Sequence, residues 1–297
     1  MPECRLCGEK EDLQVIRAPF VFGGKEEHNF WQCENCDAIY LFPIPSLEEE
    51  KKFYLQEFEG FMSSRVGDHR DWSNAEKHKK TNQDQVKRRL PFLEKYLKPN
   101  IVLLEIGCSS GFMLDAFKSF GANCVGIEPS GEFSEYLEQQ GYQVFDDVEE
   151  LTEQRFDIIT HFFVFEHIRN PFSFLTKSYN LLKEGGVIIC EIPCANDPLT
   201  SIYDIDAFEK FYWSIAHHYY YTPKSLSFVL DELGYEYKLV PEQRYDLSNH
   251  MTWMLEGRPG GQGKFSEFLG EEVINAYQRR AKETWSCDTI FLYVWKK

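Results

Sequence analysis

Residues 103–111, with the sequence LLEIGCSSG, constrain the fold more than any other stretch of this chain. The apolar residues predict a buried strand, Gly107 predicts a tight turn, and a helix is predicted to begin at Phe112. Because glycine has no Cβ, the backbone can turn sharply there and pass close to a ligand. The unpaired N–H groups at the start of the helix can then face an anionic group. This stretch therefore predicts a strand–turn–helix unit that binds a ligand.

Two acids lie at the ends of predicted strands, one in this unit and one after the strand that follows it. Glu105 is at the end of the first predicted strand, and Glu128 follows the next apolar run. An acid at such a position suits the hydroxyls of a ribose diol. The glycines of the turn are Gly107 and Gly111, with Ser109 between them, so the spacing differs from the G-x-G-x-x-G of a dinucleotide turn. The spacing disfavours a nicotinamide oxidoreductase.

Further along the chain, predicted buried strands alternate with helices. Residues 156–168 predict a strand that leads into a loop, residues 172–182 an amphipathic helix, and residues 187–192 another strand. The stretches LLEIGCSSG, GIEPS, FDIITHFFVFEHIRNP and LLKEGGVIICEIP follow one another in an order and at a spacing that resembles the class I S-adenosylmethionine-dependent methyltransferases. The resemblance covers about residues 85–240.

This resemblance implies an α/β fold with a doubly wound, mostly parallel seven-stranded sheet, and S-adenosylmethionine as the cofactor. Residues 235–240 and 289–295 are expected to form the last strands, the second of them antiparallel. Ser109 replaces a second glycine of many family members, and it is small enough to leave binding intact. Asp147 is placed near the adenine, with a solvated loop acid as the alternative. The residues that the resemblance places at the cofactor are Glu105, Gly107, Cys108, Ser109, Gly111, Glu128, Pro129, Asp147, Val148 and Phe163.

Two C-x-x-C pairs lie near the N-terminus, Cys4 with Cys7 and Cys33 with Cys36. Tetrahedral zinc takes four soft ligands, and each pair presents two thiolates from a tight turn. Strand-like segments and a glycine pair lie between them, which is typical of a zinc ribbon. Redox dithiols or core cysteines are the alternative. Because four thiolates leave no open position for water, the predicted zinc is structural.

Residues 196–225 form an insertion that is dense in aromatic side chains. About half of these rings are expected to pack in the core, and the others to line the cleft where ligands bind. The run AHHYYYTPKSL resembles a stretch of sugar methyltransferases in which a histidine acts as the base. His217 matches that histidine, while Ala216 replaces the glutamate before it. His167 is a second candidate base, and a structural role is the alternative for either residue.

The net charge of −16 disfavours nucleic acid as a partner, because phosphate binding needs a basic surface. Nine cysteines without a signal peptide or an apolar stretch of membrane length predict reduced thiols in the cytoplasm. One basic cluster lies in a helix predicted over about 75–97. It is either a solvated helix face or a contact for the diphosphate of a nucleotide-linked substrate. Its residues are Lys77, Lys79, Lys80, Lys87, Arg88 and Arg89.

The chain is predicted to divide into a zinc-ribbon module at 1–45, a helical cover at 46–98 and a methyltransferase domain at 99–297. Ser46 and Glu49 form a capping box at the start of the cover. The resemblance implies methyl transfer to the oxygen or carbon of a small acceptor, a nucleotide-linked sugar or a surface-polysaccharide unit. An RNA methyltransferase with a zinc-binding head and a non-catalytic cofactor-binding scaffold are the alternatives.

Overall fold

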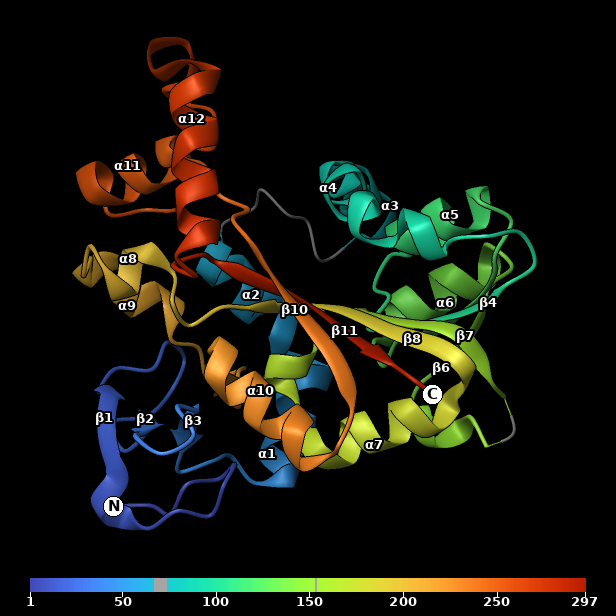
Figure 1. Cartoon of the computed structure of the whole chain (residues 1–297), viewed down its shortest axis with the longest axis horizontal. Helices are drawn as coiled ribbons and strands as arrows, with labels where there is room; N and C mark the ends of the chain where they lie inside the picture. Colours follow the sequence, from blue (N-terminus) through green and yellow to red (C-terminus); the bar gives the residue numbers. More distant parts are fainter. Residues whose placement is uncertain (67–73, 153) are drawn as a thin grey trace.

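The computed structural model of this chain describes residues 1–66, 74–152 and 154–297. A seven-stranded sheet forms its centre, and a four-stranded sheet lies near the N-terminus (Figure 1). The strands of the central sheet are β4 (Val102–Ile106), β5 (Asn123–Ile127), β6 (Gln143–Phe145), β7 (Phe156–Phe162), β8 (Leu182–Pro193), β10 (Glu236–Glu242) and β11 (Thr289–Trp295). The helices of eight or more residues are α2 (Phe58–Val66), α4 (Gln83–Leu93), α5 (Phe112–Ser119), α6 (Gly131–Gln139), α7 (Pro171–Leu181), α10 (Pro223–Glu232), α11 (Leu247–Glu256) and α12 (Ser266–Glu283).

The central sheet has the strand order β10-β11-β8-β7-β4-β5-β6. The strands from β8 to β6 run parallel, whereas β11 is antiparallel to both β8 and β10. The order reverses between β7 and β4, and ligands bind at such switch points in open α/β sheets. The doubly wound, mostly parallel sheet is confirmed, and so is the antiparallel strand at 289–295.

Both faces of the sheet are covered by helices (Figure 1). Successive side chains of a strand point to opposite faces, and Leu104 and Leu103 of β4 accordingly belong to two different apolar clusters. Leu175 of α7 packs in the cluster of Leu104, together with residues of α10. Met113 of α5 and Leu93 of α4 pack in the cluster of Leu103. Burial on both faces explains why these strands are apolar throughout rather than alternating.

Local signals set the ends of several helices. Ser46 and Glu49 form the predicted capping box at the start of α1 (Leu47–Lys52). The helix predicted over 75–97 is instead divided into α3 (Ala75–Thr81) and α4. The division lies at Asn82, whose side-chain amide donates to the carbonyl oxygen of His78 at 2.8 Å. That carbonyl would otherwise accept the backbone N–H of a continuing helix.

The N-terminal sheet contains β1 (Gln14–Ala18), β2 (Asn29–Cys33), β3 (Ile39–Phe42) and β9 (Tyr219–Tyr220), in that order. Strand β9 comes from the aromatic insertion and pairs antiparallel with β3, with Tyr219 opposite Tyr40. The cysteine-rich segment and the insertion therefore share one sheet across the boundary that the sequence suggested near residue 45. Among the described parts of the chain, every helix is too short or too polar to span a lipid bilayer.

Candidate active site

The backbone turns sharply at the carboxyl end of β4. Gly107 has a φ of +71°, which favours glycine, and a Cβ at this position would stand 2.6 Å from Cγ2 of Val164. Gly111, at φ +74°, is the N-cap of α5, and a Cβ there would collide with Leu137 of α6. A side chain fits at neither glycine. The turn therefore lies directly against the loop that follows β7.

Two buried carboxyl groups lie beneath this turn. The carboxylate of Glu128 accepts hydrogen bonds from the backbone N–H of Ser109 at 2.6 Å and of Ser130 at 3.0 Å. Burial raises the pKa of Glu128 to about 7 and that of Glu105 to about 8. Oε2 of Glu105 is buried and has no hydrogen-bond partner among the described residues. The site thus holds polar oxygen atoms that can accept hydrogen bonds from ligand hydroxyls.

The other predicted cofactor residues follow neighbouring strands of the same sheet edge. Phe163 comes directly after β7 and has a φ of +57°. Cys108 is buried, and its sulfur would lie only 2.6 Å from a Cβ on residue 126. Asp147, after β6, is exposed and accepts a hydrogen bond from Glu149 N at 2.8 Å, as the N-cap of a short helix. Pro129 follows Glu128, and Val148 follows Asp147.

Two histidines and a glutamate from distant segments meet beside this edge. His167 follows β7 in a short helix, and its ring centroid lies 4.7 Å from that of His217 in the insertion. Oε1 of Glu166 lies 4.0 Å from Nε2 of His167. The backbone N–H of His218 donates to the carbonyl oxygen of Glu166 at 2.8 Å, which holds the two segments together. The three side chains bring one ligand atom each within 4.8 Å of the others.

The environment of this cluster keeps both imidazoles neutral. Burial lowers the pKa of His167 to about 4 and the pKa of His217 well below its usual value. Burial also raises the pKa of Glu166 to about 8. Nδ1 of His167 lies 2.7 Å from the carbonyl oxygen of Ala216, so we assign its proton to Nδ1. Nε2 of His167 is then left with a free lone pair.

A neutral imidazole with a free Nε2 can accept a proton, or it can bind a metal ion. Nδ1 of His217 and Oε2 of Glu166 are buried and have no hydrogen-bond partner in the described parts of the chain. Two histidines and one carboxyl group are also a ligand set for divalent transition metals. The sequence suggested His217 and His167 as separate candidates, and Glu166 was missed. The sequence feature that could have indicated Glu166 is its position directly before His167, which was already a candidate base.

The aromatic insertion contributes mainly to packing. Phe208, Tyr212, Trp213 and Tyr220 are buried in one cluster with Phe30 of β2. A cavity of about 250 Å³ lies alongside, between α1 and the segment 215–218. Residues that line it include Pro45, Glu50, Tyr54, Ala216 and His218. Because Ala216 also contacts His167, this cavity provides room for a ligand next to the histidine cluster.

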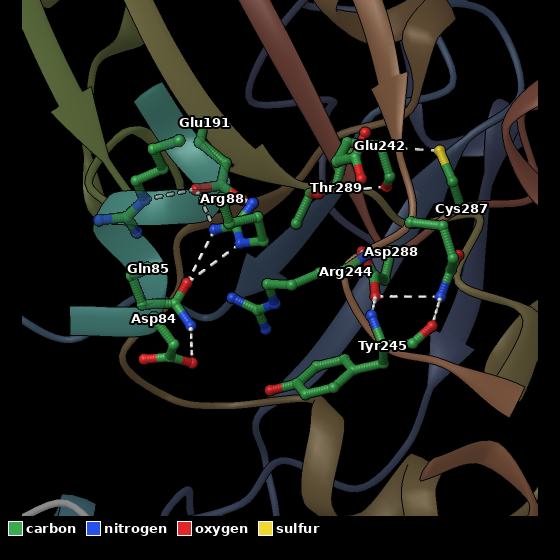
Figure 2. A network of polar contacts seen from close by, with 12 residues as sticks. Asp84, Gln85, Arg88, Glu191, Glu242, Arg244, Tyr245, Cys287, Asp288 and Thr289 are labelled. Carbon is green, nitrogen blue, oxygen red and sulfur yellow. Dashed lines mark hydrogen bonds and ion pairs between the residues drawn. The ribbon is translucent and has the colours of Figure 1, made fainter. Parts of the chain in front are cut away.

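A network of charged residues gathers around Glu191 and Arg244, two residues that the sequence reasoning missed (Figure 2). Glu191 of β8 is fully buried and accepts hydrogen bonds from Arg88 at 2.8 Å and Arg89 at 2.9 Å. Arg244 follows β10, and its guanidinium lies 4.6 Å from the ring centroid of Phe163. The sequence carried a signal only for Arg88 and Arg89, which belong to the basic cluster.

The four N-terminal cysteines converge. Sγ of Cys4 lies 3.6 Å from Sγ of Cys36, and Sγ of Cys7 lies 3.7 Å from Sγ of Cys33. All four sulfurs lie within 4.8 Å of one another. Four thiolates around one zinc ion stand about 3.8 Å apart, given Zn–S bonds of about 2.3 Å, whereas a disulfide requires about 2.05 Å. The donor set and its spacing fit a tetrahedral zinc ion.

A family model described as "Methyltransferase domain" matches residues 78–240, more than half of the chain. The chain is also similar to the ubiquinone biosynthesis O-methyltransferases of Maricaulis maris, with 30% identity over 98 residues, and of Ruegeria pomeroyi, with 33% identity over 97 residues. Each alignment covers 30% of this chain and 39% of the relative. The chain thus spans well under half the length of these relatives.

Two solved structures share the fold. A SAM-dependent methyltransferase from Archaeoglobus fulgidus superimposes with a TM-score of 0.51 and 21% identity, covering 72% of this chain and 94% of that chain. The plantazolicin methyltransferase BpumL, in complex with a monoazolic substrate analogue and SAH, superimposes with a TM-score of 0.51 and 15% identity. That alignment covers 84% of this chain and 94% of the other.

Proposed function

Because this chain belongs to the methyltransferase-domain family, we propose that it transfers a methyl group from S-adenosylmethionine to a hydroxyl oxygen of a small acceptor. The hydrogen bond from Nδ1 of His167 to the carbonyl of Ala216 carries this proposal. It leaves a neutral Nε2 as a proton acceptor in the loop after β7. A hydroxyl acceptor must lose its proton during transfer, whereas a neutral amine can attack without a base.

The residues around Gly107 fit the cofactor. A side chain at this position would fill the space against Val164, and the carboxyl groups of Glu105 and Glu128 offer acceptors for ribose hydroxyls. S-adenosylmethionine supplies an electrophilic methyl group when bound. Glu128 would hold the ribose, while the turn at Gly107 and the loop at Phe163 would enclose the remainder of the molecule.

His167 is our proposed base, and His217 is its neighbour in the same cluster. The carbonyl of Ala216 orients the imidazole and stabilises the imidazolium that forms when Nε2 takes the acceptor proton. The sequence pattern favoured His217 as the base but offered no carboxylate partner for it. The carboxyl group of Glu166 lies 4.0 Å from Nε2 of His167, whereas the carbonyl of Ala216 is the partner at Nδ1.

The acceptor is a small molecule in this proposal. The sequence pattern favours a nucleotide-linked sugar or a glycan unit, while the relatives are named as O-methyltransferases of ubiquinone biosynthesis. Both kinds of acceptor carry hydroxyl groups, so each is consistent with a histidine base. The carbon acceptors that the sequence pattern also allowed need a base too, and the names of the relatives favour oxygen.

We also propose one structural zinc ion at Cys4, Cys7, Cys33 and Cys36. The sulfur spacing and backbone N–H groups near Cys4 support it, since the N–H of Leu6 lies 3.4 Å from Sγ of Cys4. Such N–H groups lower the cost of gathering thiolates. The cluster lies next to β3, which pairs with β9, so the metal would stabilise the insertion that carries His217.

Transfer of a radiolabelled methyl group tests the function. Purified chain and labelled S-adenosylmethionine are incubated with 3,4-dihydroxybenzoate and, separately, with UDP-glucose, and the products are separated. Label bound to an acceptor oxygen is the expected result with at least one of them. Calorimetry with S-adenosylhomocysteine gives an independent reading of the cofactor site. Absence of cofactor binding would overturn the proposal.

A further inference from the structure

The backbone of Arg244 is held rigidly between β10 and α11. Asp288, a buried residue before β11, accepts the N–H of Arg244 at 2.9 Å and the N–H of Tyr245 at 2.8 Å. The same carboxylate accepts from the side-chain amide of Gln243 at 3.1 Å. Three hydrogen bonds to one buried carboxylate fix this loop, so the arginine side chain starts from a preorganised position.

Two aromatic rings lie close to the Arg244 guanidinium. Its central carbon lies 4.6 Å from the ring centroid of Phe163 and 4.5 Å from that of Tyr245. A guanidinium that stacks on aromatic rings keeps its N–H groups free in its own plane. Phe163 directly precedes Val164, which contacts the glycine turn. The arginine therefore reaches the edge of the proposed cofactor site.

The N–H groups of this guanidinium have no partner in the described parts of the chain. Nε of Arg244 is buried without a hydrogen bond, and no carboxylate among the described residues forms an ion pair with the side chain. Figure 2 shows the guanidinium extending toward Gln85 and Arg88 with no dashed contact. A buried or half-buried donor without an acceptor is costly, and a ligand can remove that cost.

The carboxylates nearby are engaged elsewhere. Glu191 forms ion pairs with Arg88 at 2.6 Å and with Arg89 at 2.9 Å. Asp288 accepts from the backbone of the Arg244 loop, and Asp84 accepts from the side-chain amide of Gln85 at 3.1 Å. Glu191 is thus shared by Arg88 and Arg89, whereas Arg244 forms no ion pair among the described residues.

We propose that Arg244 binds an oxyanion of the methyl acceptor, a carboxylate or a phosphate group, and so selects acceptors that carry one. This inference rests on the proposed function, because it assigns a substrate class to the same site. The planar fork of arginine matches both kinds of oxyanion with two parallel hydrogen bonds. Arg88 and Arg89, for which the sequence left open a solvated helix face or a diphosphate contact, form ion pairs with Glu191 behind Arg244.

The test uses the full chain saturated with S-adenosylhomocysteine and two anionic probes. 4-Hydroxybenzoate represents a carboxylate and inorganic pyrophosphate a phosphate, and each is titrated by ligand-observed NMR. Wild-type protein is expected to bind at least one probe. Arg244→Gln should weaken that binding about 10- to 100-fold, the range for losing hydrogen bonds to a charged group. Arg244→Lys keeps the charge but not the fork, and an intermediate loss is expected.

The matched control is Arg280→Gln, an exposed arginine on α12 whose nearest acid is Glu283 at 3.8 Å. Its affinity for either probe should equal that of the wild type. Equal affinity in Arg244→Gln and wild type, or binding of neither probe by the wild type, overturns the inference. The probe that binds distinguishes a carboxylate from a phosphate. S-adenosylhomocysteine affinity is measured on each variant, so a failure of the cofactor site is seen separately from a failure of anion binding.

Discussion

Nδ1 of His167 lies 2.7 Å from the carbonyl oxygen of Ala216, the residue before His217. This contact joins the loop after β7 to the aromatic insertion. It assigns the proton of His167 to Nδ1 and leaves Nε2 as the acceptor. The sequence suggested the two histidines as alternatives, whereas the structure places them in one cluster in which each has a different environment.

The two histidines are expected to respond differently to substitution. His167→Asn should lower turnover by roughly 10²–10⁴-fold, the usual contribution of a general base, with cofactor affinity retained. His217→Asn should have the smaller effect, because its Nδ1 lacks the carbonyl partner that orients His167. Steady-state kinetics with the identified acceptor checks both variants. The reverse ranking would return His217 to the role of base.

Stability should depend on pH through His167. Its pKa is lowered by burial from 6.5 to about 4, so between these values the unfolded chain binds a proton that the folded chain does not. The contribution of His167 to stability is therefore constant above about pH 6.5 and falls as the pH decreases toward 4. The slope from one such group is at most about 1.4 kcal/mol per pH unit. Urea unfolding at several pH values should show the free energy of unfolding of the wild type decreasing relative to that of His167→Asn as the pH falls from about 6.5 to 4.

Loss of Glu128 should weaken cofactor binding. Glu128→Ala is expected to reduce S-adenosylhomocysteine affinity by about 1.5–3 kcal/mol, the cost of losing a charged hydrogen-bond partner. Isothermal titration calorimetry measures the change. Glu138→Gln is the control, because Glu138 is an exposed acid on α6. Unchanged affinity in Glu128→Ala would remove this residue from the cofactor site.

One zinc ion per chain is expected from elemental analysis of protein purified without chelator. Cys33→Ser should lose the metal and reduce hydrogen-exchange protection in β3 and β9, while β4 and β7 of the central sheet stay protected. Cys124→Ser serves as the control, because Cys124 lies outside the cluster. Protein without stoichiometric zinc, or equal protection of β3 and β9 in Cys33→Ser, would contradict the structural role.

The histidine cluster should work without a metal ion. A brief EDTA treatment that leaves the zinc in place is expected to leave turnover unchanged if Nε2 of His167 is the base. Turnover that falls on treatment and returns on addition of Mg²⁺ or Mn²⁺ would instead show that Glu166, His167 and His217 bind a cation. Zinc content is followed in the same samples, so loss of the N-terminal metal is recognised.

Short-range features could be read from the sequence because neighbouring residues determine them. The turn at Gly107 requires a positive φ, the capping box at Ser46 requires Glu49 three residues later, and each C-x-x-C pair sets its own turn. The apolar runs likewise indicated buried strands, and the resemblance of their order to a known family implied the doubly wound sheet. These features depend on backbone sterics and local hydrogen bonds, which act over a few residues.

Tertiary structure alone decided the rest. The pairing of Tyr40 with Tyr219 and the contact of His167 with Ala216 join segments that lie far apart in the chain. Arg244 has no sequence motif, and its position depends on Asp288, which is brought to it by the pairing of β10 with β11. The helix expected over 75–97 was wrong in extent for a local reason, the side-chain hydrogen bond of Asn82 that divides it. The contacts between remote segments follow instead from how the elements pack, and no local pattern encodes them.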